Sequence, residues 1–100
     1  MRLRWLTDAL ADLRGIHDYI ARENPEAARR VVGDIRREVA LLETQPEVGR
    51  LGRLPDSREF VIQKYPYIVA YRIQANEVHL LLVVHTSRRW PKLLPATPHV

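Results

Sequence analysis

Apolar residues recur at helical spacing through the first half of the chain. In two stretches they stand three and four positions apart, which places them along one side of an α-helix. The first stretch predicts an amphipathic helix that begins after Leu6 and runs to about Arg22, and the second predicts a helix from Asn24 to about Gln45. The apolar positions are Ala9, Leu13, Ile16 and Ile20 in the first helix, and Ala28, Val31, Val32, Ile35, Val39 and Leu42 in the second.

Short polar residues mark both helix starts. Thr7 is the expected N-cap of the first helix, and Asn24 is that of the second, where Pro25 suits the first helical position. Gly15, inside the first helix, either lowers helix propensity or permits close approach of another element. The link between the helices is only one or two residues long, so we expect them to form an antiparallel hairpin.

Alternation with a period of two marks the strands. Met1–Leu6 places Leu3 and Trp5 on one side and arginines on the other, which predicts a short first strand. A loop is expected over residues 46–57, which contain two glycines, two prolines and two arginines, Arg50 and Arg53. Three strands are predicted after it, over Arg58–Lys64, Tyr67–Gln74 and Val78–His85.

The last two strands are close enough to form a hairpin. Ala75 and Asn76 separate them, and Asn tolerates the positive φ that a tight turn requires. The unbroken apolar run Leu80–Val84 predicts a strand that is buried on both faces. Beyond Trp90, three prolines predict an irregular tail over residues 92–100.

The predicted order is strand, helix, helix, strand, strand, strand. Such an order indicates an α+β domain in which an antiparallel helical hairpin packs on one face of an antiparallel sheet. The last three strands are expected to form a meander, while the pattern leaves the position of the first strand in the sheet open. With 100 residues, the chain is expected to be one domain over residues 1–91 followed by the tail.

Composition narrows the classes of function. Fourteen arginines and two lysines give a net charge of +4, which suits binding to nucleic acid or to an acidic protein. Cysteine is absent, no apolar stretch is long enough to span a membrane, and the charged N-terminus is unlike a signal peptide. We therefore expect a cytoplasmic protein without a membrane partner.

Motifs for cofactors and metals are missing. The sequence contains no phosphate-binding glycine loop, so we expect no cofactor. The four histidines lack metal-ligand spacing, and His79 and His85 would lie roughly 20 Å apart on one extended strand. We therefore expect no metal site.

Residue types suited to gripping RNA gather late in the chain. Arginine neutralises phosphate, aromatic rings stack on bases, and histidine can transfer protons near neutral pH. From residue types alone a structural interpretation is favoured, in which Tyr71 is a core residue, Arg72 pairs with Glu59 or Glu77, and Trp90 covers the end of the sheet. The candidate residues are Tyr71, Arg72, His85, Arg88, Arg89 and Trp90.

Several short motifs follow one another along the chain in a characteristic order and spacing. They are Trp5 in the first strand; Ala9, Asp12, Leu13, Ile16, Tyr19 and Ile20; Asn24-Pro25-x-Ala27-Ala28; Pro46-x-x-Gly49-Arg50; Arg58-Glu59; Tyr65-Pro66-Tyr67-Ile68-Val69-x-Tyr71-Arg72; and Val84-His85-x-x-Arg88-x-Trp90-Pro91. Together they resemble the RelE/ParE family of toxins from type II toxin–antitoxin systems. The resemblance extends to about Pro91 and is closer to the ParE-like branch.

The resemblance implies one of two activities. ParE-like toxins bind DNA gyrase and block replication, whereas RelE-like toxins cut messenger RNA on the ribosome. The ribonuclease branch needs basic residues where this chain has Glu59, Val61 and Ile68, and such side chains cannot stabilise the charge that develops on phosphate. A binding toxin that arrests growth is therefore favoured over an enzyme. If the chain is a ribonuclease, its candidate catalytic residues are Tyr71, His85, Arg88 and Arg89; as a binding toxin, its target contacts are expected at Arg72, Arg88, Arg89 and Trp90.

The resemblance also implies a cognate antitoxin that neutralises the toxin. By this likeness the antitoxin is ParD-like, and its C-terminal segment wraps over the helices and the sheet to form a hetero-oligomer. The expected antitoxin contacts are Leu13, Ile16, Ile20, Val31, Ile35 and Arg58. A degenerate member that only binds its antitoxin is the third possibility.

Overall fold

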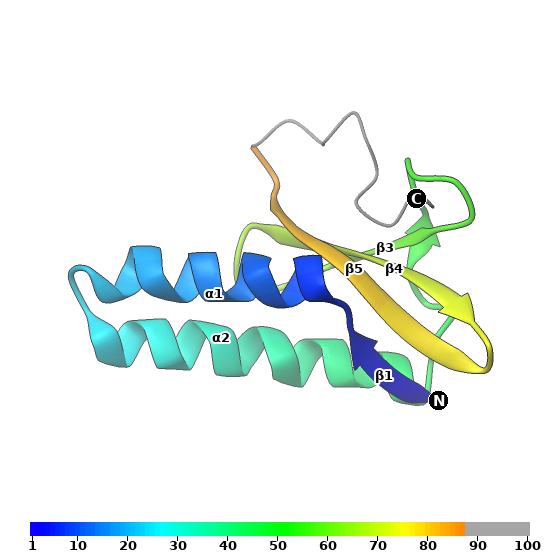
Figure 1. Cartoon of the computed structure of the whole chain (residues 1–100), viewed down its shortest axis with the longest axis horizontal. Coiled ribbons are helices and arrows are strands. Elements are labelled where there is room, and N and C mark those ends of the chain that lie inside the picture. Colours follow the sequence, from blue (N-terminus) through cyan, green and yellow to red (C-terminus); the bar gives the residue numbers. More distant parts are fainter. Residues whose placement is uncertain (88–100) are drawn as a thin grey trace.

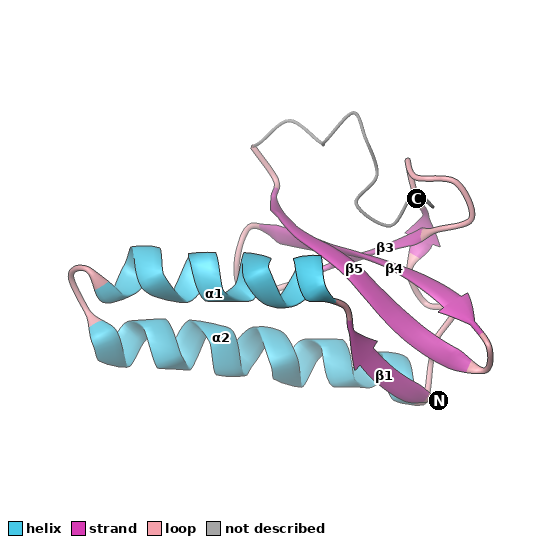
Figure 2. Ribbon diagram, in the orientation of Figure 1, coloured by secondary structure: helices cyan, strands magenta, loops and turns pink. Residues whose placement is uncertain are grey.

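The computed structural model describes residues 1–87 as two helices packed against one sheet (Figures 1 and 2). Residues 88–100 lie outside the described part, and with them the predicted tail. The elements are β1 (Arg2–Trp5), α1 (Thr7–Ala21), α2 (Pro25–Val39), a 3-10 turn η1 (Ala40–Glu43), β2 (Arg50–Leu51), β3 (Arg58–Val61), β4 (Tyr67–Gln74) and β5 (Glu77–His85).

The strands form a single mixed sheet in the order β1-β5-β4-β3-β2. The α+β class and the order of helices and strands are confirmed. Strands β2 to β5 pair in antiparallel fashion, and β1 joins the far edge parallel to β5, with Trp5 opposite Leu80. The sequence pattern had left this position open, and it also gave no sign of the two-residue β2 inside the predicted loop.

Both helices lie along one face of the sheet as an antiparallel pair (Figure 2). The core between the layers combines Leu13, Ile35 and Val39 from the helical region with Val69 and Leu80 from the central strands. A second cluster of apolar side chains lies on the other face of the sheet, made of Leu54, Ala70, Leu81, Leu82 and Val84, with Leu6 packed against it. The predicted burial of the whole run Leu80–Val84 is confirmed.

The two helix starts differ from one another. Asn24 caps α2 as predicted, because its side-chain oxygen accepts a hydrogen bond from the Ala27 N–H at 3.0 Å. The N-cap prediction for Thr7 was wrong: Leu6 occupies the cap position, without a side-chain bond, and Thr7 is the first helical residue. The reason is tertiary, since strand pairing continues one residue past β1 through the Leu6 N–H to the Leu80 carbonyl.

The ends of α2 and β3 also differ in detail from the sequence prediction. The helical segment that begins with α2 continues to Glu43, close to the predicted end, but its last turn is the 3-10 turn η1. The strand predicted to reach Lys64 stops at Val61, because the Glu38 carboxylate of α2 accepts hydrogen bonds from the N–H groups of Gln63 and Lys64. The β4–β5 turn is confirmed, with positive φ at Ala75 and Asn76.

A charged cluster fastens α2 to the β3–β4 turn. Asp34 on α2 is largely buried and accepts hydrogen bonds from the Tyr65 hydroxyl at 2.6 Å and from Arg37, while Lys64 lies 3.2 Å away. The bond from Tyr65, followed by the two cations, holds the pKa of the Asp34 carboxyl well below its ordinary value. The same bond raises the pKa of Tyr65.

Candidate functional site

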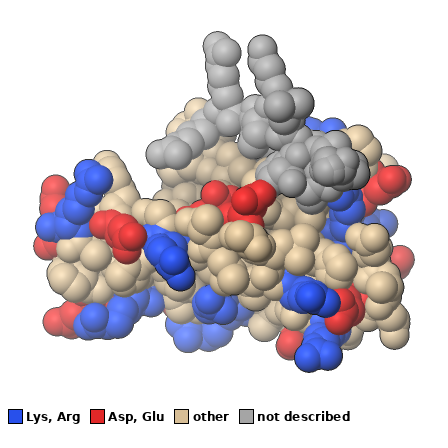
Figure 3. All heavy atoms as spheres, viewed as in Figure 1, with Lys and Arg blue, Asp and Glu red and all other residues tan. Residues whose placement is uncertain are grey.

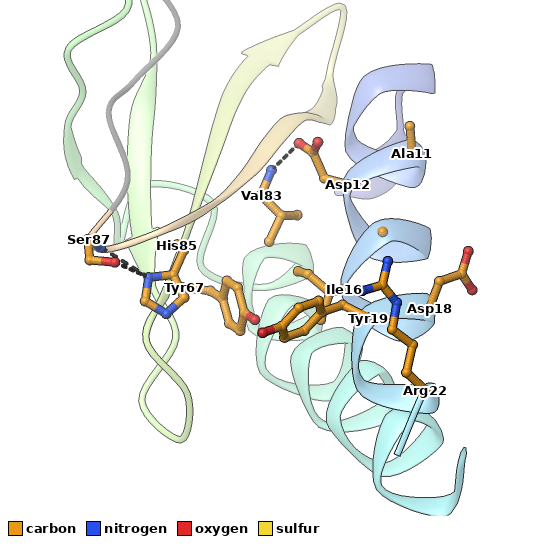
Figure 4. A pocket seen from close by; sticks show the side chains of 11 residues that line it. Ala11, Asp12, Ile16, Asp18, Tyr19, Arg22, Tyr67, Val83, His85 and Ser87 are labelled. Atoms are coloured by element: carbon orange, nitrogen blue, oxygen red, sulfur yellow. Dashed lines mark hydrogen bonds between the residues drawn. The ribbon is translucent and has the colours of Figure 1, made fainter. Parts of the chain in front are cut away.

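A cleft of about 690 Å³ lies between α1 and β5 (Figure 4). One wall is a side of α1 that lies next to the core-facing apolar stripe. The opposite wall is the end of β5 together with the start of β4. The lining includes Asp12, Gly15, Ile16 and Tyr19 from α1, and Tyr67, Val83 and His85 from the sheet.

The cleft runs along an open edge of the sheet. Strand β1 pairs with β5 only as far as Leu80, so within residues 1–87 no strand covers the edge of β5 beyond that point. The Val83 N–H on this edge donates to a carboxylate oxygen of Asp12 at 2.9 Å. Backbone groups alternate in direction along a strand, so those of His85 are the next to point outward at this edge. The cleft therefore offers backbone donors and acceptors beside an apolar wall.

His85 is held by its neighbours at the rim. Its Nδ1 lies 3.1 Å from the Ser87 backbone nitrogen and 2.8 Å from the Ser87 hydroxyl, and its ring meets that of Tyr67 edge-on at 5.3 Å. A backbone N–H can only donate, so Nδ1 is the acceptor and Nε2 carries the proton of the neutral ring. In this neutral form, the Nε2–H of His85 is the ring group left to donate a hydrogen bond.

Tyr19 and Asp12 are cleft residues that sequence analysis names among the family motifs but not among the candidate site residues. The Tyr19 side chain is 71% exposed, and the Arg22 guanidinium lies 5.6 Å from the centre of its ring. The available signal was spacing: Asp12, Ile16 and Tyr19 stand four and three positions apart, so they share one side of the helix. An exposed aromatic ring beside an open sheet edge is typical of a surface that receives another chain.

The structure does not bring the candidate ribonuclease residues together. Tyr71 is fully buried, and its hydroxyl donates to the Pro46 carbonyl at 2.7 Å and accepts from the Gly49 N–H at 2.9 Å. Tyr71 stands four residues along β4 from Tyr67, the partner of His85, which corresponds to roughly 13 Å. Burial raises the pKa of the Tyr71 hydroxyl, so this group stays protonated at neutral pH and does not supply a base. Its structural interpretation as a core residue is confirmed, and the candidates Arg88 and Arg89 lie outside the described residues.

Arg72 does not form either of the ion pairs expected for it. Its guanidinium donates twice to the Pro55 carbonyl, at 3.0 and 3.2 Å. Glu59 instead binds Arg50 and Arg53, and Glu77 binds His79 and Arg4. The prediction of an Arg72–carboxylate pair was wrong, because the loop and strand β1 bring other cations to both acids. Trp90, also predicted to contact the target, lies outside the described residues.

The predicted antitoxin contacts divide into core and surface. Leu13, Val31 and Ile35 are buried between helices and sheet, where their main contacts are within the chain, and their contact with the antitoxin stays a prediction. The apolar stripe of a helix indicates which side is covered, but it does not show whether the cover comes from the same chain. Ile16 and Ile20 are only partly buried, and Ile16 lines the cleft. These two isoleucines are therefore the predicted apolar antitoxin contacts that lie at the surface.

Arg58, the sixth predicted antitoxin contact, has a role inside the chain. Its Nη1 donates to the carbonyls of Glu47 and Gly49.

Among residues 1–87, no three metal-binding side chains come together. No helix in that part of the chain is long and apolar enough to cross a membrane.

Comparison with known proteins gives consistent results over nearly the whole chain. Residues 3–90 match the family described as the ParE toxin of the type II toxin–antitoxin system parDE. A Sinorhizobium fredii protein named as a toxin, Y4kP, is 42% identical over 93% of this chain and 96% of its own length. Toxin RelE2 of Caulobacter vibrioides is 36% identical over 84% of this chain and 93% of its own length. A chain in a structure titled as the chromosomal ParDE system from P. aeruginosa superimposes with a TM-score of 0.79 at 29% identity, covering 87% of this chain and 97% of that one.

Proposed function

Because this chain belongs to the ParE toxin family of type II toxin–antitoxin systems, we propose that it arrests growth by binding DNA gyrase. We propose further that a ParD-like antitoxin neutralises it in a cytoplasmic hetero-oligomer. The toxin role follows from the family, while the gyrase target and the mode of antitoxin binding are the proposal.

The geometry around Glu59 and Tyr71 is the observation that favours binding over catalysis. By the family resemblance, the ribonuclease branch would have a basic residue at the position of Glu59. Here Glu59 is buried and accepts hydrogen bonds from Arg50 and from the Arg53 backbone. The Tyr71 hydroxyl is engaged by the same loop. Both side chains hold the fold together, and an inhibitor that acts by binding needs no catalytic group of its own.

The cleft between α1 and β5 is the proposed antitoxin site. An extended antitoxin segment would add a strand to the open edge of β5 and form backbone hydrogen bonds beside Val83 and His85. Its apolar side chains would cover Ile16 and the exposed ring of Tyr19. The P. aeruginosa structure, whose title names a ParDE toxin–antitoxin system, supports a partner of this kind.

A supercoiling assay tests the gyrase target. We expect purified protein to inhibit DNA gyrase, and addition of the cognate antitoxin to restore supercoiling. Topoisomerase I relaxation of the same plasmid is the control for nonspecific DNA binding and should be unaffected. Full gyrase activity at a large excess of toxin would contradict the proposal.

Message cleavage on the ribosome is the alternative function. The position of His85 at the rim of the α1–β5 cleft, together with the likeness to a protein named RelE2, is the observation in its favour. Primer extension on translated messages would reveal cuts at codon positions, and their absence would remove this alternative. Arg88→Ala and Arg89→Ala are expected to weaken toxicity under either function, with unchanged melting temperatures.

A further inference from the structure

Residues 46–57, named here the arginine loop, are held rigidly although most of them have no regular structure. Tyr71 binds the Pro46 carbonyl and the Gly49 N–H on the helix-covered face of the sheet. Arg72, the next residue of β4, binds the Pro55 carbonyl. Successive residues of a strand point to opposite faces, so the loop is fastened from both sides of the sheet.

Close packing within the loop requires two glycines. A Cβ at Gly49 would lie 2.5 Å from the Tyr71 hydroxyl, and one at Gly52 would collide with the Ser57 hydroxyl. The Gly52 N–H donates to the Ser57 carbonyl, which closes the turn. The loop therefore has one conformation that its own side chains and the sheet enforce.

A buried carboxylate underlies the exposed part of the loop. The Glu59 side chain is 2% exposed and accepts hydrogen bonds from the Arg50 guanidinium at 3.0 and 3.2 Å and from the Arg53 N–H at 2.9 Å. A buried charge is tolerated only when paired, so Glu59 fixes the direction of Arg50. The guanidinium-bearing side chains of Arg50 and Arg53 remain 55% and 52% exposed.

The loop displays a leucine between these arginines. Leu51 is 80% exposed, the largest exposure of any large apolar side chain within residues 1–87, and nearby Val48 is 50% exposed. Arg50 and Leu51 form β2, the last strand in the sheet order, so its outer edge has no partner strand in the described part of the chain. A rigidly held, exposed leucine loses little conformational entropy when it enters a pocket.

We propose that Arg50, Leu51 and Arg53 form the surface with which this toxin grips its target. The occupant we infer is a protein surface with an apolar pocket for Leu51, rimmed by carboxylates that meet the two guanidinium groups. This inference rests on the proposed toxin function. The surface lies at the opposite edge of the sheet from the α1–β5 cleft, so target and antitoxin would bind at separate places.

Charge distribution favours a protein over nucleic acid as the occupant. Glu59 lies directly beneath Arg50, and Glu47 and Asp56 belong to the same loop. In the face shown in Figure 3, basic and acidic side chains are interspersed and form no continuous basic stripe. A surface that binds phosphates needs clustered positive charge, which this loop lacks. An exposed leucine between two arginines instead stabilises a complex most when an apolar pocket of a protein covers it.

Substitutions at Leu51 test the surface with little risk to the fold, since its side chain is largely in solvent. The variants are Leu51→Ala, Leu51→Asp and Leu51→Met, with Leu41→Ala as a control leucine that is 39% exposed elsewhere. Each is expressed from an inducible promoter and scored for growth arrest at matched protein levels. Each is also purified, separated from its antitoxin, melted, and titrated in the supercoiling assay. Antitoxin binding is measured separately with the same preparations.

We expect Leu51→Ala to require ~10-fold more protein for the same effect, as for the loss of an interface hot spot, and Leu51→Asp still more. Leu51→Met and Leu41→Ala should act like wild type, and all variants should retain antitoxin binding. Unchanged potency of Leu51→Ala would overturn the proposed surface. A defect in Leu51→Asp alone would also overturn it, since it would indicate a charge-dependent contact such as nucleic acid.

Failure of the gyrase proposal gives a different result from failure of the surface. If wild type arrests growth without affecting supercoiling, while Leu51→Ala relieves the arrest, the surface is supported and gyrase is the wrong target. If wild type inhibits gyrase and Leu51→Ala does so equally, gyrase is right and the surface is wrong. Harmless expression of the wild type would overturn both.

Discussion

Replacing Tyr71 with phenylalanine separates a structural from a catalytic role for this residue. The change keeps the buried ring and removes only its hydroxyl, which donates to the Pro46 carbonyl and accepts from the Gly49 N–H. Each buried polar group left without a partner costs ~1–3 kcal/mol, so the two together should lower the free energy of unfolding by about 2–6 kcal/mol. For a domain of this size, each kcal/mol corresponds to roughly 4–8 °C, so the melting temperature should fall by at least about 8 °C.

Urea denaturation and thermal melting of Tyr71→Phe measure this loss directly. Tyr19→Phe is the matched control, because that side chain is 71% exposed and its change should stay within about 0.5 kcal/mol. Amide hydrogen exchange should show faster exchange at Gly49, while Val69 in the centre of β4 follows global unfolding. At temperatures where it remains folded, Tyr71→Phe should still arrest growth. A loss below about 1 kcal/mol, or abolished toxicity in a fully stable variant, would refute the reasoning.

Three further predictions concern the helices. Gly15→Ala should stabilise the protein by ~0.5–1 kcal/mol, because no atom lies within 4 Å of the added methyl group, and so should Gly33→Ala, where the nearest atom is 3.7 Å away. Only Gly15→Ala should weaken antitoxin binding in calorimetry, because Gly15 lines the cleft and Gly33 does not. Equal affinities of the two variants would place the antitoxin elsewhere. Asp34 has a lowered pKa, so the stability it contributes is present above its unfolded pKa of ~3.9 and declines as the pH falls below about 5; urea midpoints of Asp34→Asn should fall less over that range than those of wild type, and parallel curves would exclude this role. Leu13→Ala and Ile35→Ala should each cost ~2–4 kcal/mol in urea unfolding as core truncations, and a cost below about 1 kcal/mol would mean that these residues are not in the core.

Two separate surfaces have a consequence for regulation. If the antitoxin occupies the α1–β5 cleft and the target meets Leu51, neutralisation cannot result from simple overlap at one site. The antitoxin would then block the target sterically, or a further segment of it would extend across the sheet to cover Leu51. A complex of toxin with the cleft-binding segment alone should therefore retain some affinity for the target, which a pull-down with gyrase measures.

The sequence alone determined what depends on local periodicity and local chemistry. The spacing of Leu13 and Ile16 identified α1 as amphipathic, the alternation along β4 and β5 identified strands, and Asn24 identified the start of α2. Neighbouring residues make these choices, because a helix turn or a cap joins positions at most four apart. The ordered set of short motifs carried the family resemblance for the same reason, since each motif is read from adjacent residues.

Only the tertiary structure decided which side chains the elements bring into contact. The Asp12 carboxylate meets the Val83 N–H across 71 positions, Glu38 ends β3 from α2, and Tyr71 holds a loop 22 to 25 positions away. Periodicity shows which side of an element is apolar, but the covering element is set by packing of the whole chain. For this reason the apolar stripe alone does not distinguish a core residue such as Leu13 from a partner contact, and the α1–β5 cleft exists because β1 stops short along β5.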